Sequence, residues 1–297
     1  MPDPSITLAR HETELAWWEM ANRPPSARLR GLVAGLCDYR EATAMPLRRR
    51  EVPCPTVTLI LSFGEPLRVL PGAASFTSFV AGLHDRPVTI SHDGRQRGIQ
   101  VDLTPLGAFA LLGVPMHELA NRVVPLGELL DRDAESLVER LAATRGPAAR
   151  FEILETALAA RMAAGPGIAP EVGAAWRLLE RSDGLVPVAR LAGEVGWSRR
   201  HLVDRFREQV GLPPKVAARV LRFQRAAGLI TGGARSWADV ALTCGYYDQA
   251  HLNRDFRALA GCTPGAYLAA MLPDCGGFSD GDESQLPFVQ DGARLAG

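Results

Sequence analysis

The sequence lacks the usual marks of a secreted, membrane-spanning or zinc-bound protein. Its five cysteines, at positions 37, 54, 244, 262 and 275, form no CxxC or CxxH pair. An odd and scattered set of this kind argues against a disulfide framework and fits a reducing compartment, so we expect a cytoplasmic protein. No apolar run approaches the roughly 18–20 residues that span a membrane. The first twenty residues also lack the charged and then apolar layout of a signal peptide.

The net charge is also zero, but the charged residues are unevenly distributed along the chain. The 297 residues carry 33 basic and 33 acidic side chains, which taken alone speaks against a nucleic-acid partner. Residues 168–272 hold 14 basic and 9 acidic residues, whereas residues 273–297 hold 1 and 5. Residues 1–167 are close to neutral, with 18 and 19. A basic segment thus lies between a neutral region and an acidic tail, as expected for a surface that meets phosphates.

The first third of the chain has the pattern of short β-strands. Segments rich in Val, Ile, Thr and Phe alternate with Gly, Pro and Asp, at 56–63, 76–83, 87–91 and 98–103. Short strands at about ten-residue spacing are typical of a β-sandwich or a small barrel. Residues 11–22, in contrast, are interpreted as a polar stretch with helical character, in which Trp17 and Trp18 cap a core.

Helical periodicity follows, and it suggests how the chain divides. Apolar residues recur every three or four positions in 106–112, 116–121, 134–143 and 147–162. The small-residue stretch AAGPGIAP at 163–170 is typical of a linker. We therefore predict an α+β fold with a β-rich sensor or dimerisation domain and its helical extension at 1–162, a linker at 163–170, an all-α domain at 171–272 and an acidic flexible tail at 273–297.

One pattern occurs twice in the all-α region, about 50 residues apart. Each copy has a short helix that ends at a glycine, a polar residue that caps a second helix, and a Leu–Phe pair four residues apart on that helix. These features are typical of a helix-turn-helix unit, and two copies strengthen the prediction. The copies match at Gly196, Ser198, His201, Leu202, Phe206 and Gly211, and at Gly245, Asp248, His251, Leu252, Phe256 and Gly261.

A third helix is predicted between the copies, over residues 213–230. At ~1.5 Å per residue, roughly 17 helical residues span about 25 Å. A rigid connector of this length can place two reading helices in consecutive major grooves, which are about 34 Å apart along one face of a duplex.

The outer faces of the two second helices carry side chains that suit base reading. Positions 200, 203, 204 and 207 lie away from the first Leu–Phe pair and hold Arg, Val, Asp and Arg. The matching positions 250, 253, 254 and 257 hold Ala, Asn, Arg and Arg. Arg can chelate guanine, and Asn or Gln can chelate adenine. Asp204 repels phosphate, unless it pairs with Arg200 or accepts from a cytosine amine.

At these residues the chain resembles the AraC/XylS family of bacterial transcription regulators. The segments LAGEVGWSRRHLVDRFREQVGLPP and ADVALTCGYYDQAHLNRDFRALAGCTPGAYL carry the resemblance, which covers about residues 168–272. It implies a seven-helix DNA-binding domain, and the region before it is similar to the cupin-like sensor domains that accompany this module. Asp204 departs from the basic residue of some members. By position, the DNA-contacting residues would be Arg199, Arg200, Val203, Asp204, Gln249, Ala250, Asn253 and Arg254, with Arg207 and Arg257 available to phosphates.

We therefore predict a sequence-specific DNA-binding transcription regulator and no enzyme. Its expected partners are double-stranded DNA, RNA polymerase, a small-molecule effector held by the N-terminal domain, and a second copy of the chain, with no cofactor and no membrane. His84, His92 and His117 lack the spacing of a metal-binding cupin and are interpreted as surface or hydrogen-bonded core residues, so we expect no metal. The effector-binding residues, the operator and the choice between activation and repression stay open.

Two other interpretations remain. In the first, Cys54 or Cys37 is a nucleophile that accepts a methyl group or senses an oxidant, because the cations at 48–50 could lower the pKa of a nearby thiol. A small buried or loop thiol is the simpler interpretation of either cysteine. In the second, the repeated unit is only a helical scaffold for protein contacts.

Overall fold

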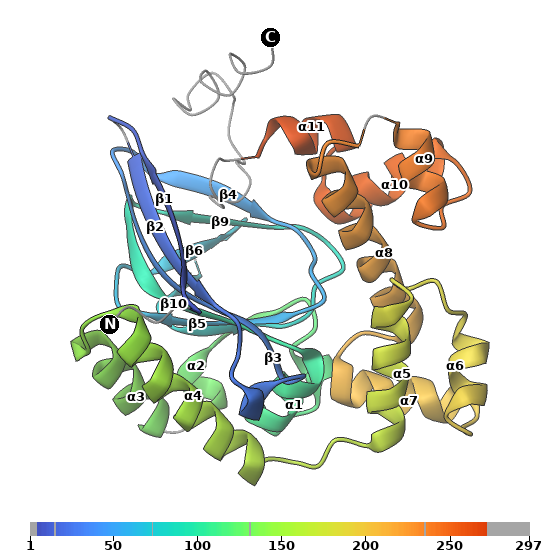
Figure 1. Ribbon diagram of the computed structural model, residues 1–297, viewed down its shortest axis with the longest axis horizontal. Coiled ribbons are helices and arrows are strands. Elements are labelled where there is room, and N and C mark those ends of the chain that lie inside the picture. The colour runs from blue at the N-terminus through green and yellow to red at the C-terminus, as the bar shows by residue number, and fades with distance from the viewer. Residues whose placement is uncertain (1–4, 15, 73, 131, 235, 272–297) are drawn as a thin grey trace.

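The computed structural model describes residues 5–14, 16–72, 74–130, 132–234 and 236–271 (Figure 1). Two β-sheets form the N-terminal part together with helices α1 to α4, and seven further helices, α5 to α11, make up the described C-terminal part. The predicted α+β fold, β-rich first and all-α afterwards, is confirmed. The predicted acidic tail at 273–297 lies entirely outside the described residues.

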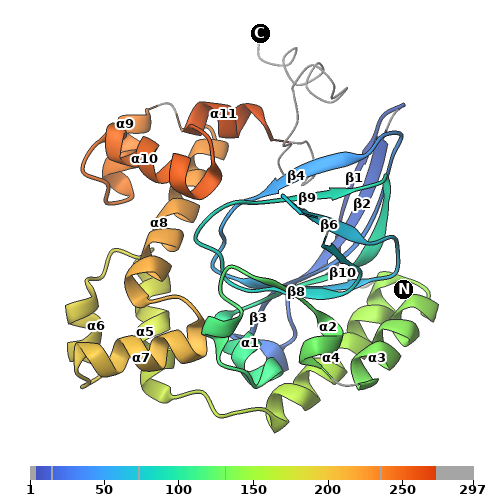
Figure 2. The same ribbon diagram turned by 180° about the vertical axis from the view of Figure 1, so that it is seen from behind.

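The N-terminal region is built from two facing antiparallel sheets (Figure 2). The larger sheet has seven strands in the order β1-β2-β3-β10-β5-β8-β11, and the smaller has four in the order β4-β9-β6-β7. The predicted strands correspond to β5, β7 with β8, β9 and β10. The strands are β1 (Thr7–Glu12), β2 (Ala16–Arg23), β3 (Val33–Thr43), β4 (Leu47–Glu51), β5 (Val57–Ser62), β6 (Leu67–Leu70), β7 (Ser75–Phe76), β8 (Phe79–Ala81), β9 (Val88–His92), β10 (Arg95–Leu103) and β11 (Val123–Pro125).

Strand β10 shows how one strand serves both the core and the space between the sheets. Ile99, Val101 and Leu103 are fully buried in a hydrophobic cluster that they share with the helices. The alternate residues Gln100 and Asp102 point the other way and line the interior between the sheets. Because successive side chains of a strand point to opposite faces, a single strand separates an apolar core from a polar interior.

The helical interpretation of residues 11–22 is wrong. These residues form most of the antiparallel pair β1 and β2, in register from Thr7–Asn22 to Glu12–Trp17. Trp18 is fully buried, as predicted for a core residue, whereas Trp17 is 38 % exposed. That alternation belongs to a strand with one buried face. Pairing of β2 with β3 outweighs the helix propensity of residues such as Glu, Ala and Met.

Helices α1 to α4 cover the outer face of the larger sheet, and the predicted helices at 106–112, 134–143 and 147–162 are confirmed. Helix α1 lies very close to the segment that leads into β3, and Gly107 makes this approach possible. A Cβ atom at Gly107 would lie 1.9 Å from the Leu32 carbonyl oxygen. The prediction at 116–121 corresponds to one 3-10 turn, η2. The elements are α1 (Pro105–Leu112), η2 (Met116–Glu118), α2 (Leu126–Leu129), α3 (Arg132–Ala143) and α4 (Pro147–Ala164).

The predicted linker at 163–170 begins in the last residues of α4 and ends at the first residue of α5. The coil between these helices packs against the rest of the molecule. A Cβ atom at Gly165 would lie 1.8 Å from the Ala110 carbonyl oxygen of α1, and the Ala169 amide donates to Gln209 Oε1 at 3.0 Å. The division of the chain into domains stays a prediction.

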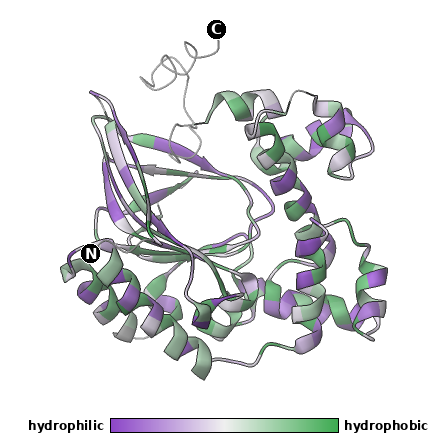
Figure 3. Cartoon of the chain, in the orientation of Figure 1, coloured by the Kyte–Doolittle hydropathy of each residue, from purple (hydrophilic) through white to green (hydrophobic). Residues whose placement is uncertain are grey.

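The C-terminal helices pack as amphipathic elements, with hydrophilic and hydrophobic residues interleaved along them (Figure 3). The long helix α8 joins two hydrophobic clusters: its first half packs with α5 to α7, and its second half with α9 to α11. Within the described residues, no helix combines the length and apolar character needed to cross a membrane. The helices are α5 (Pro170–Arg181), α6 (Val188–Glu194), α7 (Arg199–Val210), α8 (Pro214–Thr231), α9 (Trp237–Thr243), α10 (Gln249–Ala260) and α11 (Pro264–Ala269).

Candidate DNA-binding surface and ligand cavity

The first repeated unit consists of α6, a glycine turn and α7. Gly196 has a positive φ of 69°, and the next amide, that of Trp197, donates back to the Ala192 carbonyl oxygen at 3.0 Å. Such a bond closes a helix end through a left-handed residue. The Ser198 hydroxyl then accepts from the His201 amide at 3.2 Å and caps α7, as predicted.

The second unit, α9 and α10, repeats this geometry. Gly245 has a φ of 71°, and the Tyr246 amide donates to the Ala241 carbonyl oxygen at 2.9 Å. The Asp248 carboxylate accepts from the His251 amide at 2.7 Å. The two turns therefore present α7 and α10 in the same way, although the second turn is one residue longer.

The Leu–Phe pairs anchor both helices. Leu202, Phe206, Leu252 and Phe256 are all fully buried. The Phe206 ring lies 6.2 Å from the Trp176 ring of α5, and the Phe256 ring lies in edge contact with Phe223 of α8 at 4.9 Å and with Tyr267 of α11 at 5.6 Å. Burial of one face of each helix leaves the opposite face turned outward.

The predicted DNA-contacting side chains all lie on these outward faces. Eight of the ten are exposed, whereas Val203 and Asn253 are half-buried. No ion pair or side-chain hydrogen bond within the described residues engages any of them, so the pair between Arg200 and Asp204 considered above is not formed. The structure does not test which of them meet bases. The ten are Arg199, Arg200, Val203, Asp204, Arg207, Gln249, Ala250, Asn253, Arg254 and Arg257.

Sequence reasoning missed one exposed residue beside this surface. Tyr247, in the turn before α10, is 87 % exposed. It lies within the turn of the second unit that is one residue longer than the first, so the change of repeat spacing from 49 to 50 was the available signal. A tyrosine hydroxyl is a hydrogen-bond donor, and from this exposed position it could reach a phosphate.

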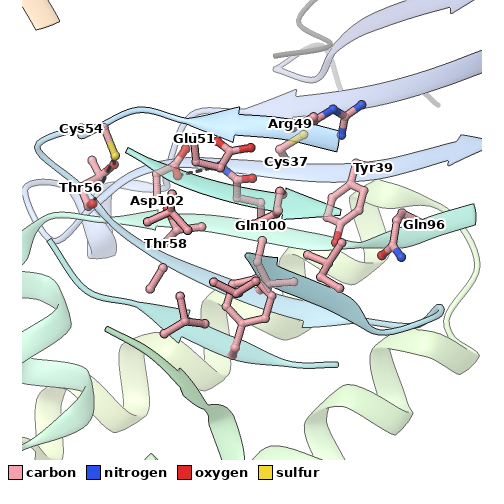
Figure 4. Close-up of a pocket in the computed structure, with 18 of the residues that line it drawn as sticks. Cys37, Tyr39, Arg49, Glu51, Cys54, Thr56, Thr58, Gln96, Gln100 and Asp102 are labelled. Atoms are coloured by element: carbon pink, nitrogen blue, oxygen red, sulfur yellow. Dashed lines mark hydrogen bonds between the residues drawn. The ribbon is translucent and has the colours of Figure 1, made fainter. Parts of the chain in front are cut away.

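A cavity of about 380 Å³ lies between the two sheets (Figure 4). Its walls combine apolar residues such as Ile60 and Phe79 with a set of polar and ionisable side chains. Most polar walls come from alternate positions of β3, β4 and β10, the faces turned away from the helix-covered core. These polar residues include Cys37, Tyr39, Glu41, Arg49, Glu51, Cys54, Gln96, Gln100 and Asp102.

One acidic residue of the cavity, Glu41, is paired with basic side chains that balance its negative charge. Arg49 donates to both carboxylate oxygens of Glu41, and His92 Nε2 lies 2.9 Å from Glu41 Oε1. Burial opposes ionisation of Glu41, but the hydrogen bond from His92 and the charge of Arg49 outweigh it and hold the pKa below its usual range.

Two other carboxyl groups lack such partners. Asp102 accepts one hydrogen bond, from Gln100 Nε2 at 2.9 Å, and burial raises its pKa. Glu51 is exposed at the end of β4, yet partial desolvation of its carboxyl group beside the cavity raises its pKa; Arg49 opposes the rise, and the charges of Glu41 and Asp102 add to it. No hydrogen-bond or ion-pair partner among the described residues reaches the Glu51 carboxyl group.

The cysteine alternative meets an unfavourable environment at Cys54. Its sulfur lies 3.4 Å from the Thr56 carbonyl oxygen and 3.3 Å from the Thr56 hydroxyl. Burial raises the pKa of this thiol, and the nearby charges that matter are the carboxyl groups of Asp102 and Glu51, not the arginines at 48–50. A reactive cysteine needs the opposite shift.

Two of the three histidines considered as metal ligands are engaged with protein groups, and the third, His117, is exposed. His92 is 2 % exposed and lies between Glu41 and the Gly94 amide, which donates to its Nδ1 at 3.3 Å. His84 Nδ1 lies 2.6 Å from the Gly82 carbonyl oxygen, and burial lowers the His84 pKa. Among the described residues no three His, Cys, Asp or Glu side chains gather in a way that could hold a metal ion.

Comparisons with known proteins concentrate on the repeated units. A family model described as a helix-turn-helix domain matches residues 191–270. The HTH-type transcriptional regulator MtrA of Neisseria gonorrhoeae is 26 % identical over 91 residues, which are 31 % of this chain and 30 % of MtrA. The putative HTH-type transcriptional regulator YkgA of Escherichia coli is 33 % identical over 82 residues, which are 28 % of this chain and 34 % of YkgA. The chain thus spans about a third of the length of these curated relatives.

A solved structure is also similar to part of the chain. A transcriptional regulator of Chromobacterium violaceum, titled as having an AraC-type DNA-binding domain, is 28 % identical, with a TM-score of 0.32 over 34 % of this chain and 90 % of that one. Residues 191–270 form a helix-turn-helix domain. The resemblance inferred from the repeat is confirmed. Residues 21–125, which hold most of both sheets, match a domain of unknown function (DUF6597).

Within the described residues, the helix-turn-helix domain and the helices beside it contact the N-terminal region through α7 and again around α8 and α10. The end of α7 packs on η2, where a Cβ atom at Gly211 would lie 3.1 Å from the Met116 carbonyl oxygen. The second contact is made by the rim segment, which we define as residues 51–54. Val52 packs on the cluster of α8 to α11, and Gln224 of α8 donates to the Pro53 carbonyl oxygen at 2.6 Å. All four residues of the rim segment also line the cavity.

Proposed function

We propose that this protein is a sequence-specific DNA-binding regulator of transcription, in which α7 and α10 enter successive major grooves. The observation that carries the proposal is the repeated arrangement of two capped, anchored helices whose outward faces are rich in Arg, Asn and Gln. A helix-turn-helix unit places the N-terminal part of its second helix against base edges. Both predicted reading faces are left open by the N-terminal region.

The spacing of the two helices supports simultaneous insertion. Helix α8 contacts both α7 and α10 and has 18 residues, so its axis is about 27 Å long. With the width of the flanking helices, this rod suits the separation of about 34 Å between major grooves on one face of a duplex. The buried Phe206 and Phe223 fix α7 and α8 within their clusters.

The charges of the reading faces support contact with a polyanion. Arg199, Arg200 and Arg207 on α7 and Arg254 and Arg257 on α10 have no ion-pair partner among the described residues. Unpaired guanidinium groups can meet phosphates or guanines without first breaking an internal bond. Asp204 also lacks a cationic partner in the described part, which favours its role as an acceptor from a cytosine amine.

The test is selection of bound duplexes from a randomised pool by the full chain, followed by sequencing. We expect two half-sites about ten base pairs apart and retention that falls steeply with salt. A double variant, Asn253→Ala with Arg254→Ala, should erase the preference in one half-site and leave the other. Retention without salt dependence, or no retention at all, would instead support the helical scaffold interpretation.

We further propose that a small molecule in the cavity controls DNA binding. The cavity is within the ~300–1,000 Å³ typical of ligand sites, and its rim segment contacts α8 and the cluster around α10. A ligand that moves the rim segment would therefore act directly on the element that sets the spacing of the two helices. Contact with RNA polymerase and assembly into a homodimer remain predictions from the sequence.

A further inference from the structure

We propose that the cavity between the sheets is selective for a cationic ligand, a small amine with an apolar body, whose ammonium group lies between Asp102 and Glu51. This inference rests on the proposed effector control and gives the effector a chemical class. It is carried by the cavity, by the two carboxyl groups that face it from different sheets, and by the way in which the cavity's own cations are already engaged.

Asp102 lies in the larger sheet with small neighbours on either side. Its partner on β3 is Gly35 and its partner on β5 is Thr58, which in turn pairs with Ala81 on β8. A Cβ atom added at Gly35 would lie 3.7 Å from Asp102 Oδ2. The absence of a side chain at Gly35 therefore leaves space beside an oxygen that has no hydrogen-bond donor within the described residues, since Gln100 donates to Oδ1.

Glu51 approaches the same space from the smaller sheet, at the end of β4. Figure 4 shows Glu51 close to Asp102 among the residues that line the cavity, with Gln100 hydrogen-bonded to Asp102. Each of the two carboxyl groups lacks a cation of its own, and the negative charge of Asp102 works against that of Glu51. A cation placed between two such groups relieves the repulsion between their negative charges.

The cations of the cavity wall are committed elsewhere. Arg49 donates to Glu41 through Nη1 and Nη2, although its Nε has no partner among the described residues, and Arg40 pairs with Glu19. His84 directs Nδ1 at the Gly82 carbonyl oxygen, which can only accept, so Nδ1 carries the hydrogen and the neutral ring offers Nε2 as an acceptor. A carboxylate ligand would therefore meet two unpaired acids without a free cation in the described residues, at a cost that an amine avoids.

A further unsatisfied acceptor lines the cavity. Gln96 is only 4 % exposed, its Nε2 donates to the Glu65 carbonyl oxygen at 2.9 Å, and its Oε1 has no partner among the described residues. A buried acceptor without a donor is costly, so the site favours a ligand that brings N–H or O–H groups. The remaining wall is apolar, with Ile60, Val69 and Phe79 available to an aliphatic or aromatic body.

The test compares three probes of similar shape and different charge: 2-phenylethylamine, 2-phenylethanol and 3-phenylpropanoate. Binding to the full chain is measured calorimetrically at pH 7.5 without DNA. We expect the amine to bind at least tenfold more tightly than the alcohol, and the carboxylate to bind more weakly than either. Equal affinities, or a preference for the carboxylate, would overturn the proposal.

Two nearly isosteric variants test the assigned residues. Asp102→Asn and Glu51→Gln should each weaken the affinity for the amine about tenfold and change the affinity for the alcohol by no more than about twofold. Glu139→Gln, on the exposed face of α3, should change neither affinity. Unchanged amine affinity in both cavity variants would refute the assignment. The calorimetric test contains no DNA, so it is independent of the proposed function. If the amine binds but no duplex is selected, the proposed regulatory function is refuted and the ligand site stands. If a duplex is selected but the amine does not bind, only the ligand site is refuted.

Discussion

Gln224 of the connecting helix α8 donates a hydrogen bond of 2.6 Å to the carbonyl oxygen of Pro53, a residue of the cavity wall. The two residues are 171 positions apart in the chain. This contact joins the cavity to the helix that spaces α7 and α10, and it gives the proposed effector control a physical route.

The contact predicts a loss of coupling in Gln224→Ala. We expect the ratio of duplex affinities with and without bound amine to move towards one, and the free energy of unfolding to fall by about 1 kcal/mol, the usual net value of one hydrogen bond. Fluorescence anisotropy with the selected duplex measures the ratio. Lys215→Ala, an exposed change on the same helix, is the control, and a coupling ratio equal to that of the wild type in Gln224→Ala would show that the route lies elsewhere.

The proposed base reading by α10 predicts different behaviour for two arginines on its exposed face. Arg254→Ala should weaken specific binding by roughly 1–3 kcal/mol and relax selectivity at one base pair, whereas Arg257→Ala should weaken all duplexes alike and reduce the salt slope by about one. Asn253→Ala should change base preference without that change of slope. Competition among sequence variants of the duplex distinguishes these results, and a uniform loss in Arg254→Ala would assign that residue to phosphate.

The aromatic cluster of the second unit predicts a large stability cost for Phe256→Ala. Phe256 is fully buried against Phe223 and Tyr267, and truncation of a buried Phe costs about 3–5 kcal/mol. Urea unfolding followed by circular dichroism measures the change. Tyr247→Ala removes an aromatic ring that is 87 % exposed and should stay within about 0.5 kcal/mol; a comparable loss in both variants would contradict the packing described.

The helix cap at Asp248 predicts a smaller and separable effect. Asp248→Ala removes the acceptor for the His251 amide and should cost about 0.5–2 kcal/mol, whereas Asp248→Asn should preserve most of the cap. Hydrogen exchange should show faster exchange in the first turn of α10 in the alanine variant. Protection equal to that of the wild type would mean that the carboxylate does not cap this helix.

The half-buried Asp102 predicts a pH-dependent gain in stability for Asp102→Asn. Burial raises the pKa of Asp102, so above its ordinary pKa of about 3.9 the folded protein holds a proton that the unfolded chain has released, and stability falls as pH rises. Asparagine has no such loss. The free-energy difference between the variant and the wild type should therefore grow from pH 4.5 to pH 7.5 in urea titrations, and a difference that is flat over this range would contradict the assigned shift.

The DNA-reading part of the molecule was accessible from the amino-acid sequence because its signals are local. A glycine stop at Gly196 or Gly245, a cap at Ser198 or Asp248 and an apolar pair four residues later act within one or two helical turns, and the structure shows each of them in place. Because these three signals occur twice, they predicted both helix-turn-helix units and the position of the helix that connects them. The contacts of individual residues with bases remain predictions.

The cavity was not accessible in the same way, because its walls come from strands that meet only through long-range pairing. Glu51 and Asp102 belong to different sheets, and nothing in their local sequence distinguishes them from ordinary surface acids. Pairing between segments also explains the error at residues 11–22, where hydrogen bonds to the following strand β3 hold a stretch of good helix formers as a strand. Short-range periodicity indicates which face of a segment is buried. It does not indicate which other segment covers that face or lines a cavity with it.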